Sequence, residues 1–155
     1  MKGIEIEKKY LVDLVKIPFS LESFDVRIIE QGYLCTAPVV RIRRDNEKYE
    51  LTYKSGGLMK RREENLPLNR EAYGHLVSKV DGRLIRKKRY MIPLNGENTG
   101  LTVELDVFEG DLAPLVLAEV EFQDEDTANA FVAPDWFGED VTFCGLYHNS
   151  YLSKL

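Results

Sequence analysis

Two carboxylates and an ammonium group alternate along the segment from Glu5 to Lys9. Side chains at every second position of a β-strand point to the same side, so Glu5, Glu7 and Lys9 would share one face. On a face open to solvent this pattern is ordinary. On a face that lines a cavity, the carboxylates could bind a hard metal cation, and the ammonium group could pair with an anion. The rest of the chain has to decide between these interpretations.

The same division into a polar and an apolar face recurs in further segments, where acidic and basic pairs occupy different segments. An antiparallel sheet with one face in water would explain any single segment. The separation of acidic pairs and basic pairs onto different segments favours a closed barrel instead. In a barrel the two kinds of segment would form an acidic wall and a basic wall around one interior. The polar positions on the shared faces are Glu5, Glu7 and Lys9; Arg41 and Arg43; Thr52 and Lys54; Arg61 and Glu63; Lys87 and Arg89; Glu104 and Asp106; and Glu119 and Glu121.

Alternating hydrophobicity and β-branched or aromatic residues predict the strands. The predicted fold is mainly β (α+β): a closed eight-stranded antiparallel β-barrel tunnel with a few covering helices. The strands are predicted over residues 4–10, 26–34, 39–44, 48–54, 59–68, 83–93, 101–108 and 115–122.

One helix is predicted between these strands and a second one after the last of them. Asn69 is expected to cap a helix that runs to about residue 80, with Gly82 as its C-terminal cap. Asp124 or Asp126 is expected to cap a second helix that ends before Pro134. Further on, residues 135–140 are predicted to form a loop, residues 141–143 an extended segment, and residues 146–153 a final helical turn.

The composition sets limits on the class of protein. A length of 155 residues predicts one domain spanning 1–155. The net charge of −5 argues against nucleic acid as the main partner. No apolar run approaches the ~20 residues of a membrane span, and the N-terminus has no signal-peptide pattern. Cys35 and Cys144 are too few for a disulfide framework and lack metal-site spacing, so the cytoplasm is the expected location.

Facing acidic and basic walls indicate a ligand that needs both. Buried charges without partners are costly, so a charged lumen is expected to hold a charged ligand. A polyphosphate with divalent metal ions fits this requirement. Arginine and lysine bind phosphate oxygens, carboxylates hold Mg²⁺ or Mn²⁺, and the metal bridges to phosphate.

The ordered set of motifs resembles the CYTH, or triphosphate tunnel metalloenzyme, superfamily, in its small bacterial single-domain type. Glu5-x-Glu7-x-Lys9 is similar to the N-terminal signature of that family, and the tail resembles its small bacterial members. The supporting motifs follow in the family's order over nearly the whole chain. They are Gln31-Gly32-Tyr33-Leu34, Arg41-x-Arg43, Thr52-x-Lys54, Arg61-x-Glu63, Lys87-x-Arg89, Glu104-x-Asp106, Glu119-x-Glu121, Ala133-Pro134-Asp135-Trp136, Val141-Thr142 and Tyr147-x-Asn149.

The resemblance implies an enzyme, a divalent-metal-dependent hydrolase that converts inorganic tripolyphosphate to pyrophosphate and phosphate inside the barrel. Its cofactor would be Mg²⁺ or Mn²⁺. The residues implied in phosphate binding are Lys9, Arg41, Arg43, Lys54, Arg61, Lys87 and Arg89. The implied metal ligands are Glu5, Glu7, Glu63, Glu104, Asp106, Glu119 and Glu121. The implied catalytic residues are Lys9, Lys54, Tyr33 and Arg89, with Tyr33 and Lys54 as candidates for orienting water.

The chain also departs from the family pattern, and other functions stay open. Cys144 and Leu146 stand where an acid and a base are common, and Asn65 stands where a second Glu is frequent. On the same fold, the alternatives are a class IV adenylyl cyclase or a thiamine or nucleoside triphosphatase. A non-catalytic module that binds polyphosphate or nucleotide is the alternative from another class, although it would not need the acidic wall. The small-molecule triphosphate is the expected partner, and the sequence gives no prediction of oligomeric state.

Overall fold

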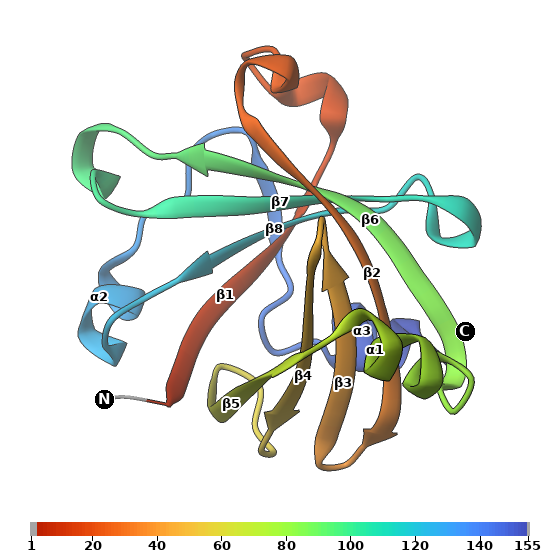
Figure 1. Cartoon of the computed structure of the whole chain (residues 1–155). Helices are drawn as coiled ribbons and strands as arrows, with labels where there is room; N and C mark the ends of the chain where they lie inside the picture. Colours follow the sequence, from red (N-terminus) through yellow and green to blue (C-terminus); the bar gives the residue numbers. More distant parts are fainter. Residues whose placement is uncertain (1–2, 155) are drawn as a thin grey trace.

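The computed structural model describes residues 3–154 and shows strands that curve into a barrel (Figure 1). All strand pairs are antiparallel. The sheet consists of β1 (Ile4–Val12), β2 (Asp25–Thr36), β3 (Val39–Asp45), β4 (Lys48–Lys54), β5 (Lys60–Leu68), β6 (Asp81–Pro93), β7 (Thr102–Phe108), β8 (Val116–Glu121) and β9 (Phe137–Asp140).

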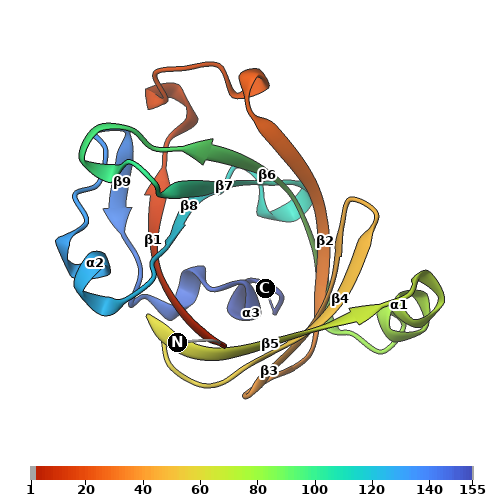
Figure 2. The ribbon, with the colours of Figure 1, turned by 60° about the vertical axis from the view of Figure 1, so that its left-hand side comes forward.

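Closure of the barrel depends on β1. The strand order is β5-β4-β3-β2-β6-β7-β8-β1-β9, and β1 also pairs with β5 through Ile4–Ile6 and Lys60–Arg62. Strands β1 to β8 therefore form a closed ring, visible in Figure 2, while β9 pairs with the end of β1 as an extra strand. The predicted closed eight-stranded antiparallel barrel is confirmed.

The strand order brings charges of one sign together. The acidic pairs lie on β7, β8 and β1, which are neighbours in the sheet. In the register of these strands Glu7 opposes Glu121, and Glu104 opposes Glu119. The arginine pair of β3 and the Lys-x-Arg pair of β6 are separated only by β2. The lumen therefore has an acidic wall and a basic wall, as the alternating pattern predicted.

Apolar side chains cover the outside of the acidic wall. Outward residues of β7 and β8, among them Val103, Leu105 and Val120, are fully buried. They belong to a cluster with aromatic side chains such as Trp136 and Phe131 from the segment after α2 (Glu125–Ala130). The Asp124 carboxylate accepts a hydrogen bond from the Thr127 backbone N–H, so the predicted cap of α2 is confirmed at this position.

Helix α1 (Arg70–Val77) covers the outside of β3 and β4. Asn69 caps it as predicted, because its side chain accepts a hydrogen bond from the Ala72 backbone N–H. The helix ends earlier than predicted, and Gly82 lies in β6 with φ +79° rather than at the helix end. No helix in the described part of the chain is both long and apolar enough to cross a membrane.

The C-terminal segment packs one end of the lumen. After β9, the short helices η5 (Gly145–Tyr147) and α3 (Asn149–Leu152) enter the ring of strands (Figure 2). Val141 and Leu152 pack there with inward side chains that include Tyr33, Phe108 and Leu117. The prediction of a loop over 135–140 was wrong, because β9 pairs with the exposed edge of β1 there.

Candidate active site

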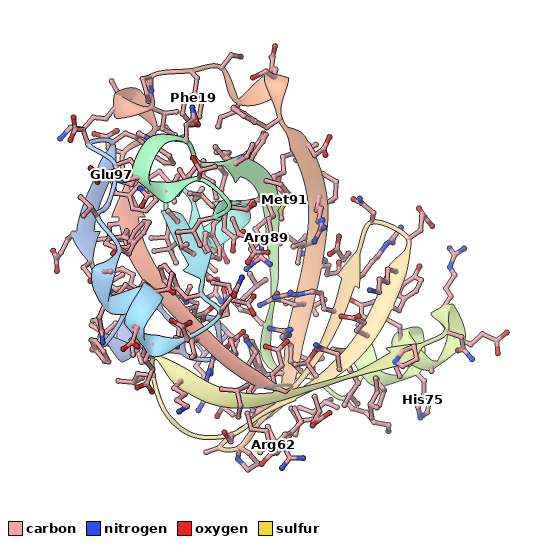
Figure 3. All side chains as sticks on the ribbon, turned by 90° about the vertical axis from the view of Figure 1, so that its left-hand side faces the viewer. Phe19, Arg62, His75, Arg89, Met91 and Glu97 are labelled. Carbon is pink, nitrogen blue, oxygen red and sulfur yellow. The ribbon has the colours of Figure 1, made fainter. Side chains whose placement is uncertain are left out.

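The lumen contains one cavity on which most of the predicted site residues converge. In Figure 3 Arg89 lies inside the barrel, whereas Arg62 and His75 lie on its outer side. Strand phase thus places Arg61, and not Arg62, in the lumen. The predicted site residues that line the cavity are Glu5, Glu7, Lys9, Tyr33, Arg41, Arg43, Lys54, Arg61, Glu63, Arg89, Glu104, Glu119 and Glu121.

Lys9 and two glutamates form the centre of the acidic wall. Lys9 Nζ lies 3.3 Å from Glu119 Oε1, and it also donates a hydrogen bond to the backbone carbonyl of Tyr147. Burial would raise the pKa of Glu119, but Lys9 and Arg89 outweigh burial and hold it well below its usual range. Glu7 has weaker cationic contacts, so burial, with Glu119 and Glu5 nearby, raises its pKa to about 8. The acidic wall therefore contains a buried carboxyl group, that of Glu7, whose ionised form is not balanced by the neighbouring cations.

A second ionic group joins β1, β4 and β5. Lys54 Nζ lies 2.9 Å from Glu5 Oε2 and 3.5 Å from Glu63 Oε2, and the Arg61 guanidinium lies 3.3 Å from Glu5 Oε1. Burial raises the pKa of Glu5. Burial acts in the same direction on Glu63, but its hydrogen bond with Glu5 and the charge of Lys54 lower its pKa to about 2. The negative charge of this carboxyl pair is therefore favoured on Glu63 rather than on Glu5.

Asp106 and Lys87 lie behind the lumen surface, and neither lines the cavity. Asp106 accepts two hydrogen bonds from the Arg89 guanidinium, at 2.7 and 2.9 Å, and lies 2.6 Å from Lys87 Nζ. Burial, with Arg89 and Arg43 nearby, lowers the pKa of Lys87 to about 7 despite this ion pair. The prediction of Asp106 as a metal ligand does not fit this geometry, because both oxygens are held by cations. Direct phosphate contact by Lys87 does not fit either, because its ammonium group is fully buried in the ion pair with Asp106.

Arg41 and Arg43 differ from the other lumen cations. Within residues 3–154, neither has a carboxylate oxygen within ion-pair distance, whereas Lys9, Lys54, Arg61, Lys87 and Arg89 all do. Their hydrogen bonds go to neutral groups: Arg41 donates to Thr52 Oγ1 and Arg43 to Gln31 Oε1. The buried Arg41 Nε has no partner among the described residues. These two guanidinium groups form a site ready for an anion.

Several cavity or supporting residues were not among the predicted site residues. Gln31 and Thr52 are fully buried. Alternation placed Thr52 on the polar face with Lys54, and Gln31 shares a strand face with Tyr33, but neither residue was assigned a role in the site. Asn65 joins Thr52 to Glu63 through hydrogen bonds of 2.6 and 2.8 Å. His148 and Asn149 line the cavity from the C-terminal segment, for which no strand pattern gave a signal.

The fold and the site define a class of protein: antiparallel barrels whose lumen has an acidic wall facing a basic one. Comparison with known proteins identifies the family. Residues 3–150 match the CYTH domain. An inorganic triphosphatase of Nitrosomonas europaea is 38% identical over 152 residues, covering 96% of both chains. An inorganic triphosphatase of Acetivibrio thermocellus is 35% identical over 158 residues, covering 98% of this chain and 94% of that protein. The chain belongs to the CYTH family.

Solved structures agree with this family. The crystal structure of an inorganic triphosphatase superimposes with a TM-score of 0.70 at 37% identity, covering 96% of this chain and 93% of that chain. A putative adenylyl cyclase from Hippeastrum, described as having a dominant triphosphatase activity, has a TM-score of 0.60 at 15% identity over 81% of this chain. That second likeness concerns the fold alone.

Membership of this family implies a divalent metal ion, and the acidic wall suits one. No three Asp, Glu, His or Cys side chains of the described residues are gathered as a ready metal site, and several of the lumen carboxylates pair with cations. The donor chemistry fits nevertheless, since carboxylate oxygens suit hard divalent ions. Glu7 and Glu121 oppose each other on β1 and β8, and burial together with neighbouring carboxylates raises the pKa of both. A cation placed between them would relieve this repulsion.

Proposed function

We propose that this chain is a divalent-metal-dependent triphosphatase that hydrolyses inorganic tripolyphosphate to pyrophosphate and phosphate, with Mg²⁺ or Mn²⁺ as the ion. The observation that carries the proposal is the pair Arg41 and Arg43, which lack carboxylate partners among the described residues and share one cavity with an acidic wall. Phosphate supplies the missing anion, and a metal-bound phosphate chain meets both walls. Both curated relatives carry the name inorganic triphosphatase.

The basic residues are assigned to the phosphate groups. Arg41 and Arg43 bind the phosphate chain of the substrate first, because no ion pair has to be broken to free these two side chains. Lys9, Lys54, Arg61 and Arg89 join as the substrate displaces part of their carboxylate contacts. Charge that spreads over the transferred phosphoryl group in the transition state is stabilised by these fixed cations.

The acidic residues are assigned to the metal. Glu5, Glu7, Glu119 and Glu121 would hold it, with Glu63 and Glu104 as further candidates at the cavity surface. When bound, the ion neutralises phosphate charge and makes water a better nucleophile. Lys54 and Tyr33 are assigned to orienting the attacking water, since both side chains reach the cavity from β4 and β2, the strands on either side of β3.

The cavity lining favours an inorganic substrate over a nucleotide. Among the described residues that line it, aromatic or apolar surface comes from Tyr33 and Val39, which belong to the cluster at the packed end, and from the imidazole ring of His148 in the C-terminal segment. A nucleobase or a thiamine ring would find little to stack on. Both cysteines are free, which fits the reduced cytoplasm as the working compartment.

The experiment is phosphate release from tripolyphosphate, ATP and thiamine triphosphate, with EDTA, Mg²⁺ or Mn²⁺. We expect metal-dependent turnover, fastest with tripolyphosphate. Arg61→Ala and Arg62→Ala form a matched pair from one strand, and only the inward variant should lose activity. Preference for ATP or thiamine triphosphate would transfer the assignment to those enzymes. Tight binding of tripolyphosphate without turnover in either metal would favour the non-catalytic module.

A further inference from the structure

Gln31 occupies a central position behind the basic wall. It lies on β2 directly opposite Arg43 on β3, with its side chain fully buried. Its Oε1 accepts a hydrogen bond from Arg43 Nε at 2.8 Å, and its Nε2 lies 3.4 Å from the Tyr33 hydroxyl oxygen. One neutral carboxamide therefore connects a phosphate-binding arginine to the tyrosine that lines the same cavity.

The chemistry of the three groups fixes the direction of these hydrogen bonds. A guanidinium group has only donors, so the Gln31 oxygen has to face Arg43. The Gln31 amide nitrogen then faces Tyr33 and donates to its hydroxyl oxygen. The hydroxyl hydrogen of Tyr33 is consequently not directed at Gln31 and is free to be donated to a group in the cavity. This arrangement makes Tyr33 a hydrogen-bond donor toward the ligand.

A comparison with Arg89 shows what a neutral partner achieves. The Asp106 carboxylate holds Arg89 through two hydrogen bonds and balances its charge. Gln31 also restrains a guanidinium group but adds no negative charge. Burial, with Arg41 and Arg89 nearby, lowers the pKa of Arg43 to about 10, which reflects positive charge without a counter-ion. Arg41 is restrained similarly, by the hydroxyl of Thr52.

The geometry points to Gln31 as a positioning residue that fixes Arg43 and the Tyr33 hydroxyl for the triphosphate while leaving the charge of Arg43 available to a phosphate group. The inference rests on the proposed function and adds a requirement to it: the holder of this arginine has to be neutral. A carboxylate of the same shape would pair with Arg43 and would also accept the Tyr33 hydrogen, turning it away from the cavity.

The test uses Gln31→Glu, which keeps the shape, and Gln31→Met, which keeps the length and neutrality but removes both hydrogen bonds. The control is Gln123→Glu, the same change at an exposed position outside the lumen. Calorimetry in EDTA gives the dissociation constant for tripolyphosphate, and steady-state rates in Mn²⁺ give kcat, KM and the metal concentration for half-activation. Thermal unfolding reports whether each variant remains folded.

We expect Gln31→Glu to weaken tripolyphosphate binding by about tenfold or more, as for the loss of one charged hydrogen bond, with half-activation by Mn²⁺ unchanged and Tm not lowered. Gln31→Met should mainly lower kcat, because Arg43 and Tyr33 keep their charge and hydrogen but lose their fixed positions. Binding by folded Gln31→Glu within twofold of the unmodified protein overturns the inference. If Gln31→Glu does not fold, the decisive result is kcat of Gln31→Met, and an unchanged kcat overturns the inference. Failure of the unmodified protein to turn over tripolyphosphate would instead overturn the proposed function.

Discussion

Replacing Asp106 with Asn tests the arrangement behind the basic wall. The side chain is fully buried and holds Lys87 at 2.6 Å and Arg89 at 2.7 and 2.9 Å. Removing one partner of a buried ion pair costs ~3–5 kcal/mol, because the remaining charge stays buried without compensation. We expect a loss of that size in the free energy of unfolding, measured by urea denaturation. A fold of ordinary stability, ~5–15 kcal/mol, would survive it.

The loss should depend on pH through Lys87. Burial places the folded pKa of Lys87, about 7, below its unfolded value of 10.5, so the cost of burying the ammonium group is present below pH 7. This cost is relieved as pH rises from 7 toward 10.5, where the folded state holds the neutral amine. Without the Asp106 charge, the folded pKa should fall further. The Asp106→Asn variant should therefore lose more stability at pH 6 than at pH 9.

Kinetics separate an anchoring role of Asp106 from a metal-binding one. With its anchor weakened, Arg89 should lose its fixed position, and kcat should fall by up to the ~10²–10³ typical of one transition-state donor. Half-activation by Mn²⁺ should not change. Glu104→Gln is the control for the stability measurement alone, because Glu104 also pairs with Arg89, at 3.4 Å, but its side chain is 25% exposed. Its stability loss should stay below ~1 kcal/mol. The anchoring role would be refuted if Asp106→Asn kept its stability and needed a higher Mn²⁺ concentration for half-activation.

Three further predictions follow from single residues. Without metal, the raised pKa of Glu7, about 8 against an unfolded 4.5, should make Tm fall as pH rises from 4.5 to 8. In EDTA, Glu7→Gln should flatten this dependence of Tm on pH. An equal slope in both proteins would contradict the burial of an uncompensated carboxyl group. Arg41→Lys should raise KM for tripolyphosphate although it keeps the charge, because the planar fork is lost, and an unchanged KM would argue against a bidentate contact. Gly32→Ala should destabilise the fold by ~1–3 kcal/mol, because a Cβ there would lie 2.7 and 2.8 Å from the Val80 methyl groups; Gly74→Ala, with open space in α1, is the control expected to be neutral or stabilising.

The barrel and its inward face could be predicted because both follow from one periodicity. Alternation assigns every strand residue to a face, and closure removes the sheet edges. The separation of acidic and basic pairs, together with the family resemblance, favoured the lumen as the place of the charged face. The preference for Arg61 over Arg62 followed from the same phase. The prediction of residues 1–155 as one domain remains a prediction.

Alternation could not tell a residue on the lumen surface from one behind it. Asp106 and Glu104 have the same phase on β7, but Asp106 lies deeper, between Lys87 and Arg89, and this depth depends on contacts with β6. The path of the C-terminal segment was also missed, since β9 forms only because β1 leaves an edge near Tyr10. The resemblance marked Asn149 within Tyr147-x-Asn149, but the place of His148 and Asn149 in the cavity lining depends on tertiary contacts, which alternation along a strand does not encode.

The central claim is that the basic wall binds phosphate and the acidic wall binds the metal. The measurement that tests it most directly is the initial rate of tripolyphosphate hydrolysis by Arg41→Ala and Glu119→Gln, each titrated with Mn²⁺ at a fixed substrate concentration. Arg41→Ala should be slower by ~10²–10³ at every metal concentration, because it lacks a charge that stabilises the transition state. Glu119→Gln should recover part of its rate as Mn²⁺ rises, because its defect is in metal affinity. Recovery of the Arg41 variant with metal, and none in the Glu119 variant, would show that the two walls have been assigned the wrong way round.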